Sequence, residues 1–143
     1  MITRAITLLA LNLFFASPSE ADSVNLNVLV DGIKQETGTI VVRVYNKDNW
    51  LSDAPLQTAS LALPADYSGS AVTIPMDIAL GNYAFTAYHD LDDNGQMNKT
   101  VIGLPAEPVG LSNDHKPRFG PPRYRKAEIT IGSDTSEIRI SLD

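Results

Sequence analysis

Cysteine is absent from the 143-residue sequence. Its absence excludes disulfide bonds, cysteine nucleophiles, thiolate metal sites and a lipid-bearing N-terminal cysteine. Positive charge is also scarce, with 11 lysines and arginines against 17 aspartates and glutamates and a net charge of -6. This balance argues against a nucleic-acid partner, which would require a basic contact surface.

Recognisable catalytic motifs are missing as well. The sequence has no G-x-S-x-G nucleophile elbow, no H-E-x-x-H zinc motif and no glycine-rich dinucleotide or phosphate loop. Ser112, Asp114 and His115 are too close in sequence for the usual arrangement of a catalytic triad. We therefore predict a non-enzymatic protein without catalytic residues.

The first 21 residues have the pattern of a secretory signal. Arg4 precedes an apolar run over residues 5–11 that resumes over residues 13–16, and Ser19 and Ala21 provide small residues before a cleavage site. The run is too short for a membrane-spanning helix, which needs about 20 apolar residues. The pattern predicts a signal peptide over residues 1–21, export to the periplasm or beyond, and a single domain over 22–143 without a membrane span.

The remaining chain alternates apolar and polar residues with a period of two, which is typical of strands with one dry face. Glycine- and aspartate-containing turns separate the runs, and no window has a helical stripe. The pattern predicts an all-β fold, an antiparallel two-sheet sandwich of about seven strands that is transthyretin-like or immunoglobulin-like. Trp50 and Leu51, in a segment with room for one helical turn, are expected to plug an end of the sandwich. The expected strands cover residues 24–30, 40–45, 59–63, 72–76, 83–87, 127–131 and 138–142.

Residues 89–123 lack a clean strand pattern and contain five of the nine prolines. Loops of this length are uncommon in compact domains unless they are functional or disordered. Apolar residues spread along the segment favour one long ordered loop that packs on the body of the domain. These expected anchors are Met97, Val101, Ile102, Leu104, Val109, Leu111 and Phe119.

The start of this segment matches the first half of a calcium-binding loop. Asp90, Asp92 and Asn94 stand at alternate positions and Gly95 follows, as in D-x-[DN]-x-[DN]-G. Alternating oxygen ligands in a tight turn converge on one point, as a hard cation requires. The predicted calcium ligands are Asp90, Asp92, Asn94, the Gln96 carbonyl and Asn98.

The second half of the calcium motif is not present. Val101 stands where the motif has a bidentate glutamate, so a complete site needs oxygens from Glu107, Asp114 or water. The alternative is an asparagine- and aspartate-rich loop held by its own side-chain to backbone hydrogen bonds. We expect any calcium binding here to be weak and the bound ion to have a structural role.

Two further features suggest a surface for a ligand or partner. His89 shares the inward parity of the strand before it, and is interpreted either as a buried residue capping the core or as a metal ligand or general base. A basic return over residues 112–126 is interpreted either as a cradle for an anionic or sugar-like ligand, or as a segment that pairs with the acidic loop. The residues assigned to the ligand or partner surface are His89, Arg118, Phe119 and Arg123.

Several motifs together resemble those of one exported bacterial family, the domain of unknown function 2141. They cover nearly the whole of the chain after the signal. The matching motifs are Gly38 to Tyr45, Leu80-Gly81-Asn82-Tyr83, His89-Asp90, Asp92, Asn94-Gly95, Met97, Gly103-x-Pro105-x-Glu107, Gly110-x-Ser112-Asn113 and Arg118-Phe119-Gly120-Pro121-Pro122. The chain departs from the expected pattern at Pro108-Val109, where a glycine–aromatic pair is more usual.

The resemblance implies a β-sandwich close to transthyretin and carboxypeptidase-regulatory modules, and it implies no activity. Taken with the residues, it favours an exported binding or accessory module whose partner is an envelope protein or a small ligand. Two alternatives remain: a periplasmic hydrolase that uses His89 and a loop aspartate, and a surface domain for protein interaction.

Overall fold

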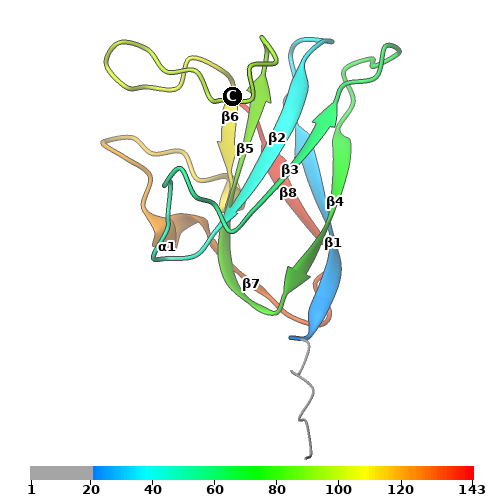
Figure 1. Ribbon diagram of the computed structural model, residues 1–143, viewed down its shortest axis with the longest axis vertical. Coiled ribbons are helices and arrows are strands. Elements are labelled where there is room, and N and C mark those ends of the chain that lie inside the picture. Colours follow the sequence, from blue (N-terminus) through cyan, green and yellow to red (C-terminus); the bar gives the residue numbers. More distant parts are fainter. Residues whose placement is uncertain (1–20) are drawn as a thin grey trace, which may run out of the picture.

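The computed structural model describes residues 21–143, so the predicted signal peptide lies outside the described residues apart from Ala21. The fold is all-β, as predicted, with eight strands and two very short helices (Figure 1). The strands are β1 (Ser23–Asp31), β2 (Thr39–Tyr45), β3 (Gln57–Ala62), β4 (Val72–Ala79), β5 (Gly81–Asp90), β6 (Val109–Leu111), β7 (Glu128–Ile131) and β8 (Glu137–Ser141). The helical turns are η1 (Ser112–Asp114) and α1 (Tyr124–Ala127). None of the helices described is long and apolar enough to cross a membrane.

The strands form two sheets that pack face to face. One sheet has the order β4-β1-β8 and the other the order β3-β2-β5-β6, with β7 also paired to β5. β7 pairs with the first part of β5 and β6 with its second part, so the two short strands share one edge of this sheet. Pairing is antiparallel as predicted, except that β8 lies parallel to β1.

The core lies between the sheets and is built by the predicted alternation. In β4 the residues alternate between buried and exposed from Val72 to Ile78, because only one face meets the other sheet. Phe85 of β5 is completely buried, and replacing such a side chain by alanine costs about 3–5 kcal/mol. The largest apolar cluster includes Leu26, Val28, Val30, Ile40, Val42, Val44, Ile74, Met76, Ile78, Phe85, Ala87 and Ile140.

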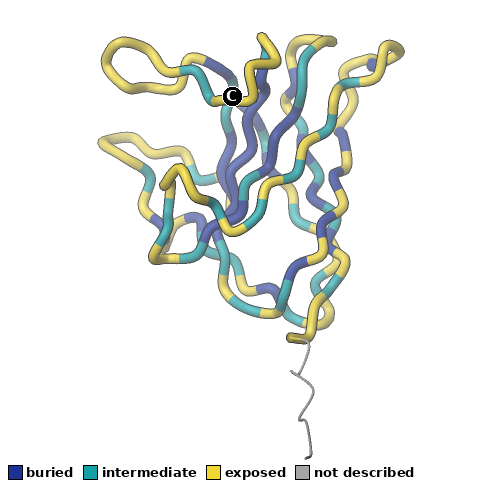
Figure 2. Tube along the Cα trace, viewed as in Figure 1, coloured by how far each residue is buried: buried dark blue, intermediate teal, exposed yellow. Residues whose placement is uncertain are grey.

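β5 is buried on both faces, which distinguishes it from a typical antiparallel strand. Ala84, Thr86, Tyr88 and Asp90 point away from the core, yet each is at most 4 % exposed. Figure 2 shows β5 as an almost continuous buried stretch. The loop after β5 and the return through η1 and α1 cover this outer face, so the segment of interest is built onto the outside of one sheet.

Three expectations about the 46–123 region were wrong. β6 was not predicted, because three residues are too few to show alternation. Leu51 is exposed, and Trp50 packs outside the sheet in a cluster with Ala84 and Tyr124, not in the end of the sandwich. Four of the expected anchors are instead exposed to solvent: Val101, Ile102, Leu104 and Phe119.

Candidate functional site

The site begins where β5 ends at Asp90. The Asp90 carboxylate is 2 % exposed and accepts hydrogen bonds from the backbone N–H groups of Asn94 (3.2 Å) and Gly95 (2.8 Å). Asp93 and Gly95 both adopt positive φ angles, 54° and 76°, which turn the chain back over the outer face of β5. The carboxylate therefore holds the first turn of the loop in place.

Glu107 holds the other end of the same loop. Its carboxylate accepts from the Leu91 N–H (2.9 Å) and from the Asn98 N–H (3.0 Å), and it is 7 % exposed. Between these two points, residues 98–106 form a small hairpin, closed by the Ala106 N–H donating to the Asn98 carbonyl (2.8 Å). Glu107 thus clamps the base of this hairpin, which we call the 98–106 hairpin.

Asp92 completes the group from the solvent side. It accepts hydrogen bonds from the side-chain amides of Asn98 (2.9 Å) and Asn94 (3.2 Å). The Asn98 hydrogen bond is the main reason that the pKa of Asp92 lies below its ordinary value of 3.8. Asp92 is therefore ionised at neutral pH.

One carboxylate oxygen from each of Asp90, Asp92 and Glu107 lies within 4.8 Å of the others. Among residues 21–143 no lysine or arginine forms an ion pair with any of the three. A set of three convergent carboxylates is chemically suited to a hard cation such as calcium, which prefers oxygen ligands. We call Asp90, Asp92 and Glu107 the carboxylate triad.

The triad includes only two of the five predicted calcium ligands, together with Glu107, which the sequence offered as a completing oxygen. Asn94 and Asn98 turn amide nitrogens towards Asp92, and the Gln96 N–H donates to the Asn94 Oδ1. Asp114 lies elsewhere, because its carboxylate accepts from the Ser141 N–H (3.2 Å). The hydrogen-bonded loop considered as the alternative is thus present, and it brings together two buried carboxylates and the exposed carboxylate of Asp92.

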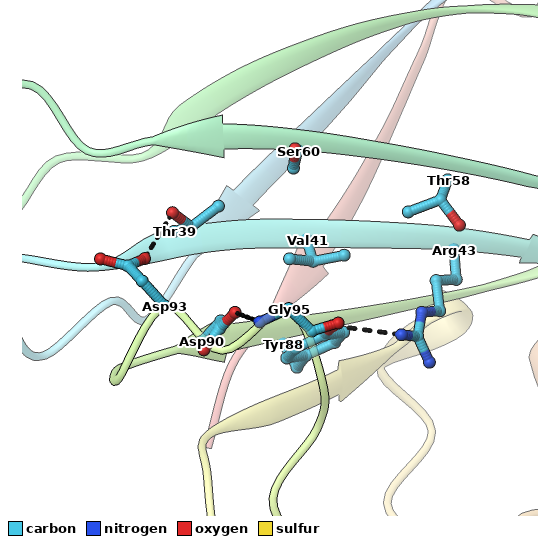
Figure 3. A pocket seen from close by; sticks show the side chains of 9 residues that line it. All are labelled: Thr39, Val41, Arg43, Thr58, Ser60, Tyr88, Asp90, Asp93 and Gly95. Atoms are coloured by element: carbon cyan, nitrogen blue, oxygen red, sulfur yellow. Dashed lines mark hydrogen bonds between the residues drawn. The ribbon is translucent and has the colours of Figure 1, made fainter.

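Beside the triad, the outer face of the β3-β2-β5-β6 sheet has an open depression of about 310 Å³ (Figure 3). At one end the Thr39 hydroxyl donates to Asp93 (2.7 Å), and at the other the Arg43 Nη2 donates to the Tyr88 hydroxyl (3.3 Å). The Arg43 guanidinium also lies 5.2 Å from the Tyr88 ring centre, a cation–π geometry. Burial raises the pKa of Tyr88 above 10.0, so its hydroxyl stays neutral. Arg43 has no carboxylate partner among the described residues and could bind an anionic group here.

His89 does not lie on this surface. Its side chain is completely buried on the inner face of β5, and its Nε2 lies 2.8 Å from the Thr37 carbonyl oxygen, to which it donates. The Nδ1 is buried without a hydrogen-bond partner among the described residues. This placement corresponds to the interpretation of His89 as a buried residue at the edge of the core.

The outer part of the basic return is exposed, and in the described residues its basic side chains form no ion pair with the acidic loop. Arg118 and Arg123 are exposed and Phe119 is 95 % exposed, so these three share a solvent-facing segment from which His89 is absent. The ion pair that this return forms in the described structure joins Lys116 to Asp143 (2.6 Å). The interpretation in which the return holds the acidic loop shut by ion pairs was therefore wrong.

Ser112 is an important residue whose role the sequence analysis missed. Its Oγ accepts from the Phe85 N–H (2.9 Å) and donates to the Ala127 carbonyl, joining β5 to α1 at a fully buried position. The segment between β6 and β7 interrupts the edge of the sheet, and Ser112 replaces the missing backbone partner. Its place in the Gly110-x-Ser112-Asn113 motif was the available signal.

Comparison with known proteins identifies a family. Residues 28–139 match the family described as "uncharacterized protein conserved in bacteria", the domain of unknown function 2141 (DUF2141). The chain belongs to this family, as its motifs predicted. No curated protein and no solved structure matched the chain.

Proposed function

We propose that this protein is an exported, non-enzymatic binding or accessory module whose 91–107 loop is organised around a calcium ion. The carboxylate triad would provide the protein's charged ligands. Export rests on the signal pattern of residues 1–21. The calcium ion has a structural role, because it fixes the base of the loop that projects from the sheet.

The observation that carries the proposal is the convergence of three carboxylates within 4.8 Å. Asp90 and Glu107 are buried, so solvent screens their mutual repulsion poorly. Backbone N–H groups already donate hydrogen bonds to both carboxylates, but these donors carry no net charge. A divalent cation would also neutralise the negative charge of the carboxylates. A site of few charged ligands in an extracellular module typically binds calcium with a dissociation constant of about 0.1–1 mM.

The burial of His89 supports a non-enzymatic role. A general base must come within hydrogen-bond reach of its substrate, either directly or through one water. His89 is 0 % exposed and its Nε2 is occupied by the Thr37 carbonyl. Turnover of ester, amide or glycoside substrates by the parent protein, abolished in His89→Ala, would contradict this part of the proposal.

Thermal unfolding with and without calcium tests the metal site. With a dissociation constant near 1 mM, 10 mM calcium stabilises the folded state by about 1.4 kcal/mol. For a domain of this size, that raises Tm by about 4–8 °C. We expect this shift in the chelator-treated parent protein and its loss in Asp92→Asn, which keeps the size of the side chain and one of its two acceptor oxygens but removes the negative charge.

Asp93→Asn is the matched control, because Asp93 is the next residue of the same loop, carries the same charge and lies outside the triad. We expect this variant to keep the calcium-dependent shift. Magnesium at the same concentration should raise Tm less, since it requires near-octahedral geometry and retains its waters. An unchanged parent Tm at 10 mM calcium, or equal shifts in parent and Asp92→Asn, would contradict the proposal.

A further inference from the structure

Large apolar side chains are exposed at the tips of two loops. Val101, Ile102 and Leu104 in the 98–106 hairpin are 105 %, 77 % and 57 % exposed, and Phe119 in the basic return is 95 % exposed. Burying such side chains is a principal source of folding free energy, so four in two loops are unusual on a monomer surface. Apolar groups gathered at protruding loop tips favour a contact surface over solitary exposed residues.

The 98–106 hairpin presents its tip in a defined conformation. The Thr100 N–H donates to the Leu104 carbonyl (2.8 Å) and the Gly103 N–H to the Thr100 carbonyl (2.9 Å). Gly103 has a φ of 82°, which closes the turn. The turn therefore holds Val101 and Ile102 away from the body of the domain, where neither can pack on the core.

The two loops project from the same side of the molecule. In Figure 1 the 98–106 hairpin and the basic return extend beyond the β6 edge of the sheet, and Figure 2 shows the outer parts of both as exposed. In sequence they flank β6, the short strand at that edge. Their apolar tips can therefore meet one extended surface together.

The same segment concentrates the positive charge of an acidic protein. Residues 99–126 contain six basic and two acidic residues, a net charge of +4. The rest of the described chain contains four basic and fourteen acidic residues, a net charge of -10. The six basic residues are Lys99, Lys116, Arg118, Arg123, Arg125 and Lys126.

We propose that the 98–106 hairpin and the basic return form a peripheral docking surface for an anionic phospholipid bilayer. The apolar tips insert between the headgroups, and the basic residues contact lipid phosphates, the two forces that hold interfacial segments on membranes. Charge complementarity favours this occupant. The net charge of +4 on residues 99–126 attracts anionic lipids, whereas the net charge of -10 on the rest of the described chain is repelled by them, so the domain binds with this segment towards the bilayer. Apolar groups on protruding tips suit insertion into a soft interface better than the fitted packing of a protein–protein contact.

Co-sedimentation with vesicles tests this docking surface. The chain, expressed at full length and purified after export, is mixed with vesicles of phosphatidylglycerol and phosphatidylcholine in equal parts, or of phosphatidylcholine alone. Chelator is present throughout, so the outcome does not depend on the calcium site. We expect binding to the anionic vesicles that is weakened by salt, and at least tenfold lower partitioning in Val101→Asp/Ile102→Asp and in Phe119→Asp.

Matched controls separate a specific surface from a general effect of charge. Leu56→Asp/Leu80→Asp changes two exposed leucines outside the two loops and should bind as the parent does. Arg118→Glu/Arg123→Glu should lose binding, whereas Lys34→Glu/Lys47→Glu, with the same charge change, should lose much less.

Absence of binding, equal binding to both vesicle types, or equal losses in variants and controls would overturn the proposal. A tip-dependent dimer or a tip-dependent complex with an envelope protein, without vesicle binding, would overturn it in favour of a protein partner.

Discussion

At the scale of single residues, Ser112 shows how a polar side chain can complete a sheet whose edge is interrupted. It occupies the gap between β6 and β7, where its hydroxyl bonds to the Phe85 N–H and the Ala127 carbonyl. Both groups belong to buried residues. Buried backbone groups require partners, so this hydroxyl is a structural requirement and not a nucleophile.

Replacing Ser112 by alanine should destabilise the domain by about 1–3 kcal/mol, because two buried backbone groups lose their partner. Chemical denaturation measures the change in the free energy of unfolding. Ser60→Ala is the control, since Ser60 is exposed in the middle of β3, and its change should stay within about 0.5 kcal/mol. Equal effects of the two substitutions would contradict the bridging role.

The titration of Asp92 provides a second test at a single residue. The Asn98 side chain is the main cause of its lowered pKa, so Asn98→Ala should move the titration midpoint of Asp92 up towards 3.8. Because the folded-state pKa is lowered, the stabilisation of the loop is present above pH 3.8 and is lost as pH falls through the folded-state value. Carbon-13 NMR of the Asp92 carboxyl measures the midpoint. An unchanged midpoint in Asn98→Ala would show that this hydrogen bond is not its cause.

At the scale of elements, alternation in the sequence was enough to predict the long strands and the two-sheet fold. β4 and β5 have seven or more residues, which is enough to display a period of two. β6 has three residues and is held by pairing with β5, so its local sequence carries no such pattern. The acidic loop begins at Asp90, as the sequence motif predicted. Glu107 joins Asp90 and Asp92 only because the 98–106 hairpin returns the chain to the end of β5, which the local sequence does not reveal.

The sequence did not reveal which apolar side chains of the 89–123 segment are buried and which are exposed. Apolar residues usually anchor a loop, and Leu111 does so. Val101 instead sits in a turn that the Gly103 N–H closes on the Thr100 carbonyl, and Phe119 precedes Gly120, whose positive φ of 68° bends the chain. Sequence composition reports hydrophobicity, whereas burial depends on where a turn directs each side chain.

Trp50 fastens the basic return to the outside of the sheet. Its indole N–H donates to the Pro122 carbonyl (2.8 Å), and its ring makes edge contacts with Tyr45 (5.5 Å) and Tyr124 (5.9 Å). Trp50→Ala should cost about 2–4 kcal/mol and speed amide exchange in residues 112–127 more than in β1. Hydrogen-exchange mass spectrometry measures this difference, with Leu51→Ala as the exposed neighbouring control. Uniform protection loss across both regions would contradict a local fastening role.

At the scale of the whole molecule, the core, the carboxylate triad and the basic segment lie in different parts of the sandwich. The core between the sheets provides stability, while the outer face of the β3-β2-β5-β6 sheet has the loops with unusual chemistry. The carboxylate triad sits at the base of the 98–106 hairpin, so occupation of the triad and orientation of the hairpin are mechanically connected. A cation at the base would stiffen the arm that ends in Val101 and Ile102.

A crystal structure grown with calcium tests the triad most directly. We predict anomalous density at one position, with oxygens of Asp90, Asp92 and Glu107 at about 2.3–2.6 Å, the distance typical of calcium. Terbium, substituted for calcium, should occupy the same position with a stronger signal. If millimolar calcium leaves the triad without density and the N–H groups of Gly95 and Asn98 stay bonded to Asp90 and Glu107, the carboxylates hold the loop without a metal and the proposed site is wrong.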